Sequence, residues 1–263
     1  MTRVGVFGAG GRMGSTVCQA VVDAPDLELV WAIDPQHEGT RLEHVGVTGS
    51  DLSILGGIFD LHSVDIDVAV DFTRVDAARN NVRWCGMNGV HAVVGTTGLT
   101  PGDLSDFAAL FTPERCNALV APNFAIGAVL MMRLSELAAP HFDSVEIIEL
   151  HHDAKVDAPS GTALLTAERI AKASQSWGQD PTEKTALEGA RGGLGPGGIR
   201  VHSVRLRGLV AHQEVLFGTA GQSLSIRHDS YDRTSFMPGV LLAIRQVASR
   251  PGLTIGLDSL LGI

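Results

Sequence analysis

One short segment of the sequence concentrates side chains that transfer protons and bind anions. Residues 149–163 read ELHHDAKVDAPSGTA. Imidazoles such as those of His151 and His152 exchange protons near neutral pH. Lys155 carries a compact positive charge that can pair with a carboxylate or donate a proton. All three side chains therefore suit an anionic substrate.

The end of the same segment is predicted to open a helix at Ser160, Gly161 and Thr162. N–H groups and hydroxyls at a helix N-terminus form an anion site, which the positive end of the helix dipole reinforces. We therefore expect a substrate carboxylate to bind there. A zinc site and plain surface polarity are the alternatives for the two histidines. Because no Cys or third His lies nearby and HHDAK lacks a metalloprotease spacing, no metal is expected.

A glycine-rich turn near the start of the chain has the pattern of a dinucleotide-binding site. Residues 4–14 read VGVFGAGGRMG, a strand-like run that leads through glycines into a helix-like run. Without Cβ atoms the turn can approach a pyrophosphate, which the helix N–H groups can hold. The spacing is G-x-x-G-x-x-G, because Met13 stands where the common fingerprint has its third glycine. A glycine turn without a ligand is the alternative. The residues expected to bind the cofactor here are Gly8, Ala9, Gly10, Gly11, Arg12 and Met13.

Asp34 is expected to recognise the ribose of the cofactor. It ends the second expected strand, where a carboxylate can accept both hydroxyls of the adenine ribose. This position favours NADH, since an adenosine 2′-phosphate would meet a like charge. Arg12 is near enough in sequence to offset that repulsion. We therefore expect use of NADH, NADPH or both, with some bias to NADH.

Two later strand ends combine small residues with polar donors and are expected to border the nicotinamide. Ordinary loop chemistry is the alternative interpretation. The residues are Gly95, Thr96, Thr97, Ala121, Pro122, Asn123 and Phe124.

A doubly wound α/β domain must position these residues. Up to about Phe124, short apolar runs alternate with segments of helical period, which is typical of βα units around a parallel sheet. Helices should begin after N-caps at Thr73 and Thr100, and Gly89 should end one. The sequence allows no prediction for residues 35–65. We expect a Rossmann-like, dinucleotide-binding domain over residues 1–125. Its strands are expected at residues 4–7, 27–33, 68–72, 92–94 and 119–120.

The pattern changes after Asn123, which predicts a smaller α+β domain over residues 126–235 for substrate binding and oligomerisation. The glycine-rich run at 191–198 is expected to be a mobile surface loop. A C-terminal helix within 236–263 should pack back on the first domain. Helices are expected at 128–137 and 162–173, a strand at 145–150 and a mostly antiparallel sheet over 199–230. Another copy of the chain can cover the edges and face of such a sheet, so we expect a homo-oligomer.

Composition narrows the class of protein. A net charge of −9 without a local Lys/Arg cluster opposes nucleic-acid binding. The sequence has no run of about 18 apolar residues, so no membrane span is predicted. The N-terminus lacks the apolar core of a signal peptide. The three cysteines have neither metal nor redox spacing and are expected to be buried free thiols. A cytoplasmic enzyme with no membrane partner is expected.

The motifs together resemble the 4-hydroxy-tetrahydrodipicolinate reductase (dihydrodipicolinate reductase) family. They occur in that family's order over nearly the whole chain: VGVFGAGGRMG, AVDFT, VVGTTG, APNFAIG, ELHH, KVDAPSGTA and GLVAHQEVLFG. The resemblance implies NAD(P)H-dependent reduction of 4-hydroxy-tetrahydrodipicolinate to tetrahydrodipicolinate in diaminopimelate and lysine biosynthesis, by a homotetramer. It makes His151 the proton donor or acceptor and Lys155 a second donor. It also makes His152 a contact of the small dicarboxylate substrate, with Gly161 and Thr162 holding a ring carboxylate.

The sequence departs from the family pattern at two places. Ala154 stands where many members have a polar residue, and the segment after Thr73 lacks a frequent proline. Two other functions stay open. A semialdehyde or amino-acid dehydrogenase would need its own catalytic residue, such as a nucleophilic Cys, and a dinucleotide sensor could keep the fold without the chemistry. The combination of His151, Lys155 and residues 160–162 favours the reductase.

Overall fold

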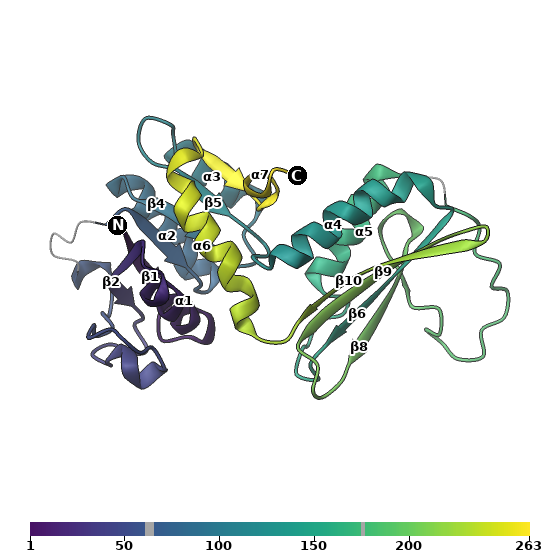
Figure 1. The fold of residues 1–263 in the computed structure, drawn as a ribbon, viewed down its shortest axis with the longest axis horizontal. Coiled ribbons are helices and arrows are strands. Elements are labelled where there is room, and N and C mark those ends of the chain that lie inside the picture. Colours follow the sequence, from purple (N-terminus) through teal and green to yellow (C-terminus); the bar gives the residue numbers. More distant parts are fainter. Residues whose placement is uncertain (61–65, 175–176) are drawn as a thin grey trace. The chain divides into compact units, whose positions relative to one another are not determined.

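The protein forms two compact units. A computed structural model describes residues 1–60, 66–174 and 177–263. Unit 1 comprises residues 1–124 and 236–263, and unit 2 comprises residues 125–235. Each unit has its own sheet and helices (Figure 1), and each is described by itself.

Unit 1 is built on a six-stranded parallel sheet, in the order β11-β5-β4-β3-β1-β2. Its central strands are buried on both faces, as continuous apolar runs in a parallel sheet require. The strand order reverses at β1, so the carboxyl ends around β1 form the crevice in which such sheets bind ligands. The predicted doubly wound fold is confirmed. The strands are β1 (Thr2–Phe7), β2 (Leu27–Ile33), β3 (Val68–Asp71), β4 (His91–Val94), β5 (Ala118–Val120) and β11 (Leu253–Ile255).

Helices cover this sheet through narrow apolar faces. In α1 the buried residues are Gly14, Val17, Cys18 and Val21, which recur at helical spacing on one side. The C-terminal segment joins unit 1 through β11, which pairs with β5, and through an ion pair between Arg245 and Asp26. The helices are α1 (Arg12–Asp23), α2 (Val75–Asn88), α3 (Pro101–Leu110), α6 (Met237–Gln246) and α7 (Asp258–Leu261).

Of three helix ends that residue types predict in unit 1, two are confirmed and one is wrong. Thr100 caps α3 in a reciprocal box with Asp103, and Gly89 ends α2 with φ 72°, so both predictions are confirmed. The predicted N-cap at Thr73 is wrong, because α2 begins after Arg74. The Thr73 hydroxyl instead donates to the carboxylate of Asp71 at 2.8 Å.

Two parts of unit 1 were beyond sequence prediction. Within residues 35–60 the structure has short 3-10 helices at Leu42–Val45 and Ile58–Asp60 and isolated bridges such as Ile33 with Leu55. Residues 61–65 lie outside the described residues. The strand β11 has only three residues, too few to show a periodic pattern.

Unit 2 is a mixed, mostly antiparallel sheet covered by two helices, as predicted. The strand order is β10-β9-β6-β8-β7, and only the pair of β6 and β8 is parallel. Figure 1 shows α4 and α5 on one face of this sheet. In β6 the residues Val145, Ile147 and Glu149 are buried and alternate with more exposed ones. The elements are α4 (Ile126–Ala138), β6 (Ser144–His151), α5 (Gly161–Ala173), β7 (Gly193–Leu194), β8 (Arg200–Arg205), β9 (Ala211–Thr219) and β10 (Gln222–Ser230).

The glycine-rich run at 191–198 is more ordered than predicted. Gly193–Leu194 pairs with β8 as a short antiparallel strand. Gly197 has φ +65°, and a Cβ there would lie 2.4 Å from the Cβ of Ala171 in α5. The expectation that this run holds no regular element is therefore wrong, because two of its residues pair with β8. Its expected mobility stays a prediction.

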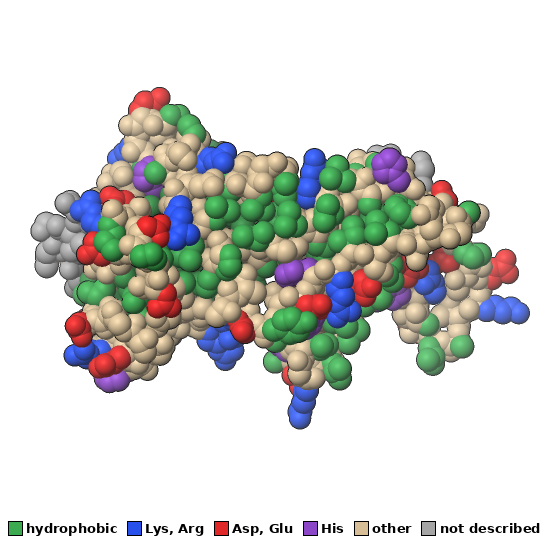
Figure 2. Space-filling view, in the orientation of Figure 1, with side chains coloured by type: hydrophobic (Ala, Val, Ile, Leu, Met, Phe, Trp, Pro, Cys, Tyr) green, Lys and Arg blue, Asp and Glu red, His purple; other side chains and the backbone are tan. Residues whose placement is uncertain are grey.

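Unit 2 also exposes an apolar stripe on α4. Leu130, Leu134 and Leu137 are 37%, 50% and 55% exposed and lie on one face of the helix. Figure 2 shows apolar side chains gathered over α4.

In the described ranges 1–60, 66–174 and 177–263, no helix is long and apolar enough to cross a membrane.

Candidate functional site

The glycine turn of unit 1 brings the N-terminus of α1 close to the end of β1. Gly8 has φ +78°, which favours glycine, and its carbonyl accepts the N–H of Gly11 at 3.0 Å. A Cβ on Gly14 would lie 1.9 Å from that same carbonyl oxygen. Gly14 therefore provides the close packing between helix and turn that the third glycine of the common fingerprint provides. This explains why Met13 is tolerated one position earlier.

The start of α1 is open for an anion. Its N-cap is Gly11, and its first turn has neither a capping side chain nor an acidic residue, all of it within the described part of the chain. The first N–H groups of a helix lack acceptors within the helix. A cavity of about 610 Å³ lies beside this turn, lined by Gly8, Gly11, Asp34 and Arg74 among others. Its size, glycine wall and free N–H groups fit a dinucleotide.

Asp34 lies at the end of β2 with its carboxylate turned toward the glycine turn. It is 9% exposed and accepts the N–H of Gly10 at 3.1 Å and that of Gln36 at 3.0 Å. The ring Nδ1 of His37 lies 3.4 Å from the same carboxylate. The exposed Arg12 is not one of the described residues that line the cavity, whereas the exposed Arg74 is.

A buried carboxylate that sequence reasoning missed joins the ends of β3 and β4. Asp71 is 2% exposed and accepts hydrogen bonds from the N–H and hydroxyl of Thr73, at 3.0 and 2.8 Å. It also accepts the hydroxyl of Thr96 at 2.7 Å and the amide of Asn81 at 2.8 Å. Asp71 thus fixes one of the predicted nicotinamide-bordering residues. Its place within AVDFT, directly after an apolar run, was the available signal.

The residues predicted to border the nicotinamide lie at the ends of β4 and β5, and none of them is among the described residues that line the cavity. The rings of Phe72 and Phe124 are 5.7 Å apart between centroids, and Phe72 also lines the cavity. A Cβ on Gly95 would lie 2.2 Å from the Phe72 ring. Phe72 therefore links the cavity to both strand ends. Of the other predicted residues there, Ala121 is buried, Asn123 is half-buried, and Thr97 and Pro122 are exposed.

In unit 2, His151 is the last residue of β6 and is held from behind by Glu149. The Nδ1 atom of His151 lies 2.5 Å from the Glu149 carboxylate. The His151 side chain is 15% exposed, whereas that of Glu149 is 0% exposed. The two residues are separated by two positions of one strand, so both side chains lie on the same face.

Arg205 of β8 completes the environment of the Glu149 carboxylate. Its two terminal nitrogens donate to the two carboxylate oxygens at 2.9 and 2.8 Å, a bidentate geometry that only a guanidinium offers. Burial raises the pKa of Glu149, but the hydrogen bonds from His151 and Arg205 outweigh it and lower this pKa from 4.5 to about 2. Glu149 is therefore ionised at neutral pH.

Lys155 lies on the loop after β6. Its Nζ atom pairs with both carboxylate oxygens of Asp157, at 2.7 and 2.8 Å, and this hydrogen bond lowers the pKa of Asp157. The backbone carbonyl of Asp157 accepts a hydrogen bond from Arg205 at 2.5 Å. His152 is exposed, and its N–H donates to the carbonyl of Val210 at 3.4 Å.

The predicted helix start at residues 160–162 is confirmed. Ser160 is the N-cap of α5, and its hydroxyl accepts the N–H of Ala163 at 3.2 Å. The N–H of Ser160 donates to Glu149 at 3.2 Å. A Cβ on Gly161 would meet nothing within 4 Å, so the surface at this helix start is open. Glu149 thus connects His151 to the N-terminus of α5.

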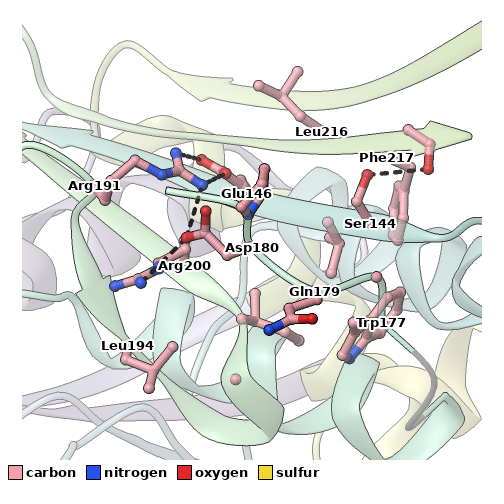
Figure 3. Close-up of a pocket in the computed structure, with 16 residues that line it drawn as sticks. Ser144, Glu146, Trp177, Gln179, Asp180, Arg191, Leu194, Arg200, Leu216 and Phe217 are labelled. Atoms are coloured by element: carbon pink, nitrogen blue, oxygen red, sulfur yellow. Dashed lines mark hydrogen bonds and ion pairs between the residues drawn. The ribbon is translucent and has the colours of Figure 1, made fainter. Parts of the chain in front are cut away.

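A second cavity in unit 2 does not include the predicted catalytic residues. It has a volume of about 410 Å³, and the described residues that line it gather around Ser144 and Glu146 at the start of β6, the opposite end from His151. Figure 3 shows that Arg191 points toward Glu146 and Asp180. Arg200 lies 3.2 Å from Asp180. Both guanidinium groups face carboxylates, so this cavity offers little uncompensated positive charge for an anion.

The chain matches one family over almost its whole length. Residues 2–124 match the family described as "Dihydrodipicolinate reductase, N-terminus" and residues 127–261 match "Dihydrodipicolinate reductase, C-terminus". The predicted resemblance is confirmed.

Similar proteins cover the full chain as well. The 4-hydroxy-tetrahydrodipicolinate reductase of Nocardia farcinica is 50% identical over 99% of each chain. That of Dictyoglomus turgidum is 46% identical over 99% of this chain and 98% of its own. A solved structure titled "Dipicolinate bound Dihydrodipicolinate reductase" from Paenisporosarcina sp. TG-14 is 42% identical, with a TM-score of 0.87 over 98% of this chain and 99% of that one.

Proposed function

Because the chain belongs to the dihydrodipicolinate reductase family, we propose that its two units carry separate parts of the reaction of that family. The reaction is the NAD(P)H-dependent reduction of 4-hydroxy-tetrahydrodipicolinate to tetrahydrodipicolinate in diaminopimelate and lysine biosynthesis. Unit 1 binds the dinucleotide through its glycine turn. Unit 2 binds the dicarboxylate through residues 151–162 and exchanges the proton.

The cavity of unit 1 supports the assignment of the cofactor residues. The free N–H groups at the start of α1 suit the pyrophosphate, and the Asp34 carboxylate suits the ribose hydroxyls. When bound, a reduced nicotinamide supplies the hydride. Asp34 favours NADH, whereas the exposed Arg74, which lines the same cavity, can donate hydrogen bonds to the 2′-phosphate of NADPH. We therefore assign the enzyme NADH, NADPH or both, with some bias to NADH.

The single observation that carries the assignment of unit 2 is the Glu149 carboxylate, which joins His151 to the N-terminus of α5. The N–H groups at Gly161 and Thr162 bind a ring carboxylate of the substrate. They belong to the same segment, residues 151–162, as His151. His151 exchanges the proton, Lys155 is a second donor, and His152 contacts the substrate. Lys155 already binds a carboxylate, that of Asp157, which illustrates the chemistry it would offer a dicarboxylate. The bound ligand of the similar Paenisporosarcina structure, dipicolinate, is of this class.

The homotetramer is proposed from the family resemblance and from the edge of the second sheet. The edge strand β10 has nine residues, Gln222–Ser230, most of them exposed. A long unpaired edge is usually covered, and another copy of the chain is a common cover. The free, buried cysteines Cys18, Cys85 and Cys116 fit a reducing cytoplasm.

A coupled assay tests the proposed function and the role of Asp34 together. The product of the upstream synthase is supplied, and oxidation of NADH and of NADPH is followed separately. We expect oxidation of both, faster with NADH at limiting cofactor. Asp34→Asn should shift the ratio of kcat/KM values toward NADPH by about 10-fold, the scale of one lost hydrogen bond to a charged group. Arg74→Gln should shift the ratio in the opposite direction.

No oxidation of either cofactor by the wild-type protein would contradict the proposed function. An unchanged cofactor ratio in Asp34→Asn would remove only the assignment of Asp34 to the ribose.

A further inference from the structure

The carboxylate of Glu149 lies at the centre of a charge network behind His151. It is 0% exposed and accepts hydrogen bonds from β6, from β8 and from the start of α5, donated by His151, Arg205 and Ser160. A buried charge is retained only where such partners satisfy it. Because Glu149 is fully buried, it acts through its neighbours and does not touch a substrate.

We infer that Glu149 and Arg205 are positioning residues for proton transfer by His151. Glu149 holds the Nδ1 atom of His151, so that Nε2 is the ring nitrogen that exchanges the proton, and Arg205 fixes the carboxylate in place. This inference rests on the proposed function, since it concerns the proton that His151 exchanges.

The chemistry of imidazole explains why this contact matters. A carboxylate at Nδ1 selects the tautomer with its proton on Nδ1, which leaves Nε2 to gain and lose the other proton. When both nitrogens of His151 are protonated, an ionised Glu149 stabilises the positive ring. The pKa of Glu149, which its hydrogen bonds lower to about 2 against the effect of burial, keeps the carboxylate ionised for this task.

Arg205 joins the two parts of the catalytic segment. Its backbone is in register with His151 across the parallel pair of β6 and β8. One guanidinium nitrogen donates both to Glu149 and to the carbonyl of Asp157, and Asp157 binds Lys155. The planar guanidinium therefore ties the loop that carries Lys155 to the carboxylate behind His151. A lysine at this position would keep the charge but lose the two-pronged geometry.

Other charged and titratable groups also face this end of β6. From β9, His212 pairs with Leu150, so its side chain lies on the opposite face of the sheet from His151. The Nδ1 atom of His212 is 2.6 Å from Asp229 of β10, and its Nε2 atom accepts the N–H of Val210 at 3.2 Å. His212 therefore has partners of its own for both ring nitrogens. The charged groups that contact the network behind His151 are Arg205 and, through the carbonyl of Asp157, the pair of Lys155 and Asp157.

The test replaces Glu149 by Gln and compares it with a matched control on the same strand. Glu146 also binds an arginine and a histidine, Arg191 and His202, but at the other end of β6. In Glu149→Gln we expect kcat to fall at least ~10-fold with a smaller change in KM. The pH profile of kcat should differ from that of the wild-type protein, because the charged carboxylate beside the ring of His151 is gone. Glu146→Gln should keep the wild-type profile.

A spectroscopic measurement gives a readout that a merely structural role would not move. The ¹⁵N shifts of the ring nitrogens of His151, assigned by their loss in His151→Gln, should show a protonated Nδ1 in the wild-type protein at a pH where the ring is neutral. In Glu149→Gln they should show a mixture of tautomers. Glu149→Asp should restore part of kcat, and dinucleotide affinity should stay within about 2-fold in all variants, because unit 1 is unchanged.

Wild-type kcat, pH profile and tautomer in Glu149→Gln would overturn the inference. If Glu149→Gln does not fold, Arg205→Lys decides by the same three readouts, with loss expected and wild-type behaviour contradicting the inference. Failure of the wild-type protein to oxidise either dinucleotide would instead count against the proposed function, and the tautomer of His151 would still report on the contact with Glu149.

Discussion

The two candidate binding regions are built by different means. In unit 1 the site consists mainly of backbone: a glycine turn and a helix start without a capping side chain, with the carboxylate of Asp34 beside them. In unit 2 it consists of side chains that hold one another, with Glu149 and Arg205 behind His151. A backbone site depends on the absence of Cβ atoms, whereas a side-chain site depends on charge. The two should therefore respond to different substitutions.

The largest effect is expected from side chains of unit 2. Replacing His151 or Lys155 by Ala should lower kcat by roughly 100-fold or more, the usual scale for a lost general acid. Dinucleotide affinity, measured by fluorescence titration, should stay close to the wild-type value. Substitution of exposed residues of the same types, His141→Ala and Lys184→Ala, provides matched controls that should keep wild-type kcat. Near-native turnover in both catalytic variants would remove the roles assigned to them.

The converse test changes the backbone site. A Cβ at Gly14 would lie 1.9 Å from the carbonyl oxygen of Gly8, so Gly14→Ala must push α1 away from the turn. We expect dinucleotide affinity to fall about 10-fold and the free energy of unfolding to fall by about 1 to 3 kcal/mol, the scale of overpacking. Titration with NADH and urea denaturation measure the two quantities.

Gly102→Ala is the matched control, because the corresponding Cβ in α3 would make only an ordinary contact at 3.6 Å. Wild-type affinity and stability in Gly14→Ala would mean that the close approach of α1 to the turn does not shape the cofactor site.

The same contrast explains what the sequence could predict. Some features follow from residues that are neighbours in the sequence: the glycine turn, Asp34 at a strand end and the helix start at Ser160. The structure has each of them in the predicted place. Glu149 could have been found, because it lies two positions before His151 on the same face of a strand. Arg205 could not, because it comes from a distant strand, and nothing in its own neighbourhood indicates a partner at Glu149.

The failed predictions have a related physical cause. Thr73 has the residue type of an N-cap, but the buried carboxylate of Asp71 takes its hydroxyl. The glycines at 191–198 resemble an irregular loop, but Gly193–Leu194 pairs with β8, and Gly197 packs closely against α5. In both cases a partner from another element decides the local structure, and local propensity is only a weak guide there.

The smallest expected effect concerns stability at acid pH. The folded-state pKa of Glu149, lowered to about 2 from 4.5, means that its ionised form stabilises the fold above about pH 4.5. That stabilisation is lost as pH falls from there toward about pH 2. Between about pH 5 and about pH 3, the wild-type protein should therefore lose about 1 to 2 kcal/mol more unfolding free energy than Glu149→Gln does. Urea denaturation of both proteins across this range measures the difference, and parallel pH dependences would show that folding does not lower the pKa of Glu149.

We propose that unit 1 binds the dinucleotide and that unit 2 exchanges the proton. The most direct test of these separate roles is a single-turnover experiment with the wild-type protein and His151→Gln. The rate of dinucleotide oxidation with the synthase product and the affinity for the reduced dinucleotide are measured on the same samples. We predict that His151→Gln binds the dinucleotide as tightly as the wild-type protein but oxidises it roughly 100-fold more slowly. Equal oxidation rates, or loss of dinucleotide binding together with the rate, would contradict it.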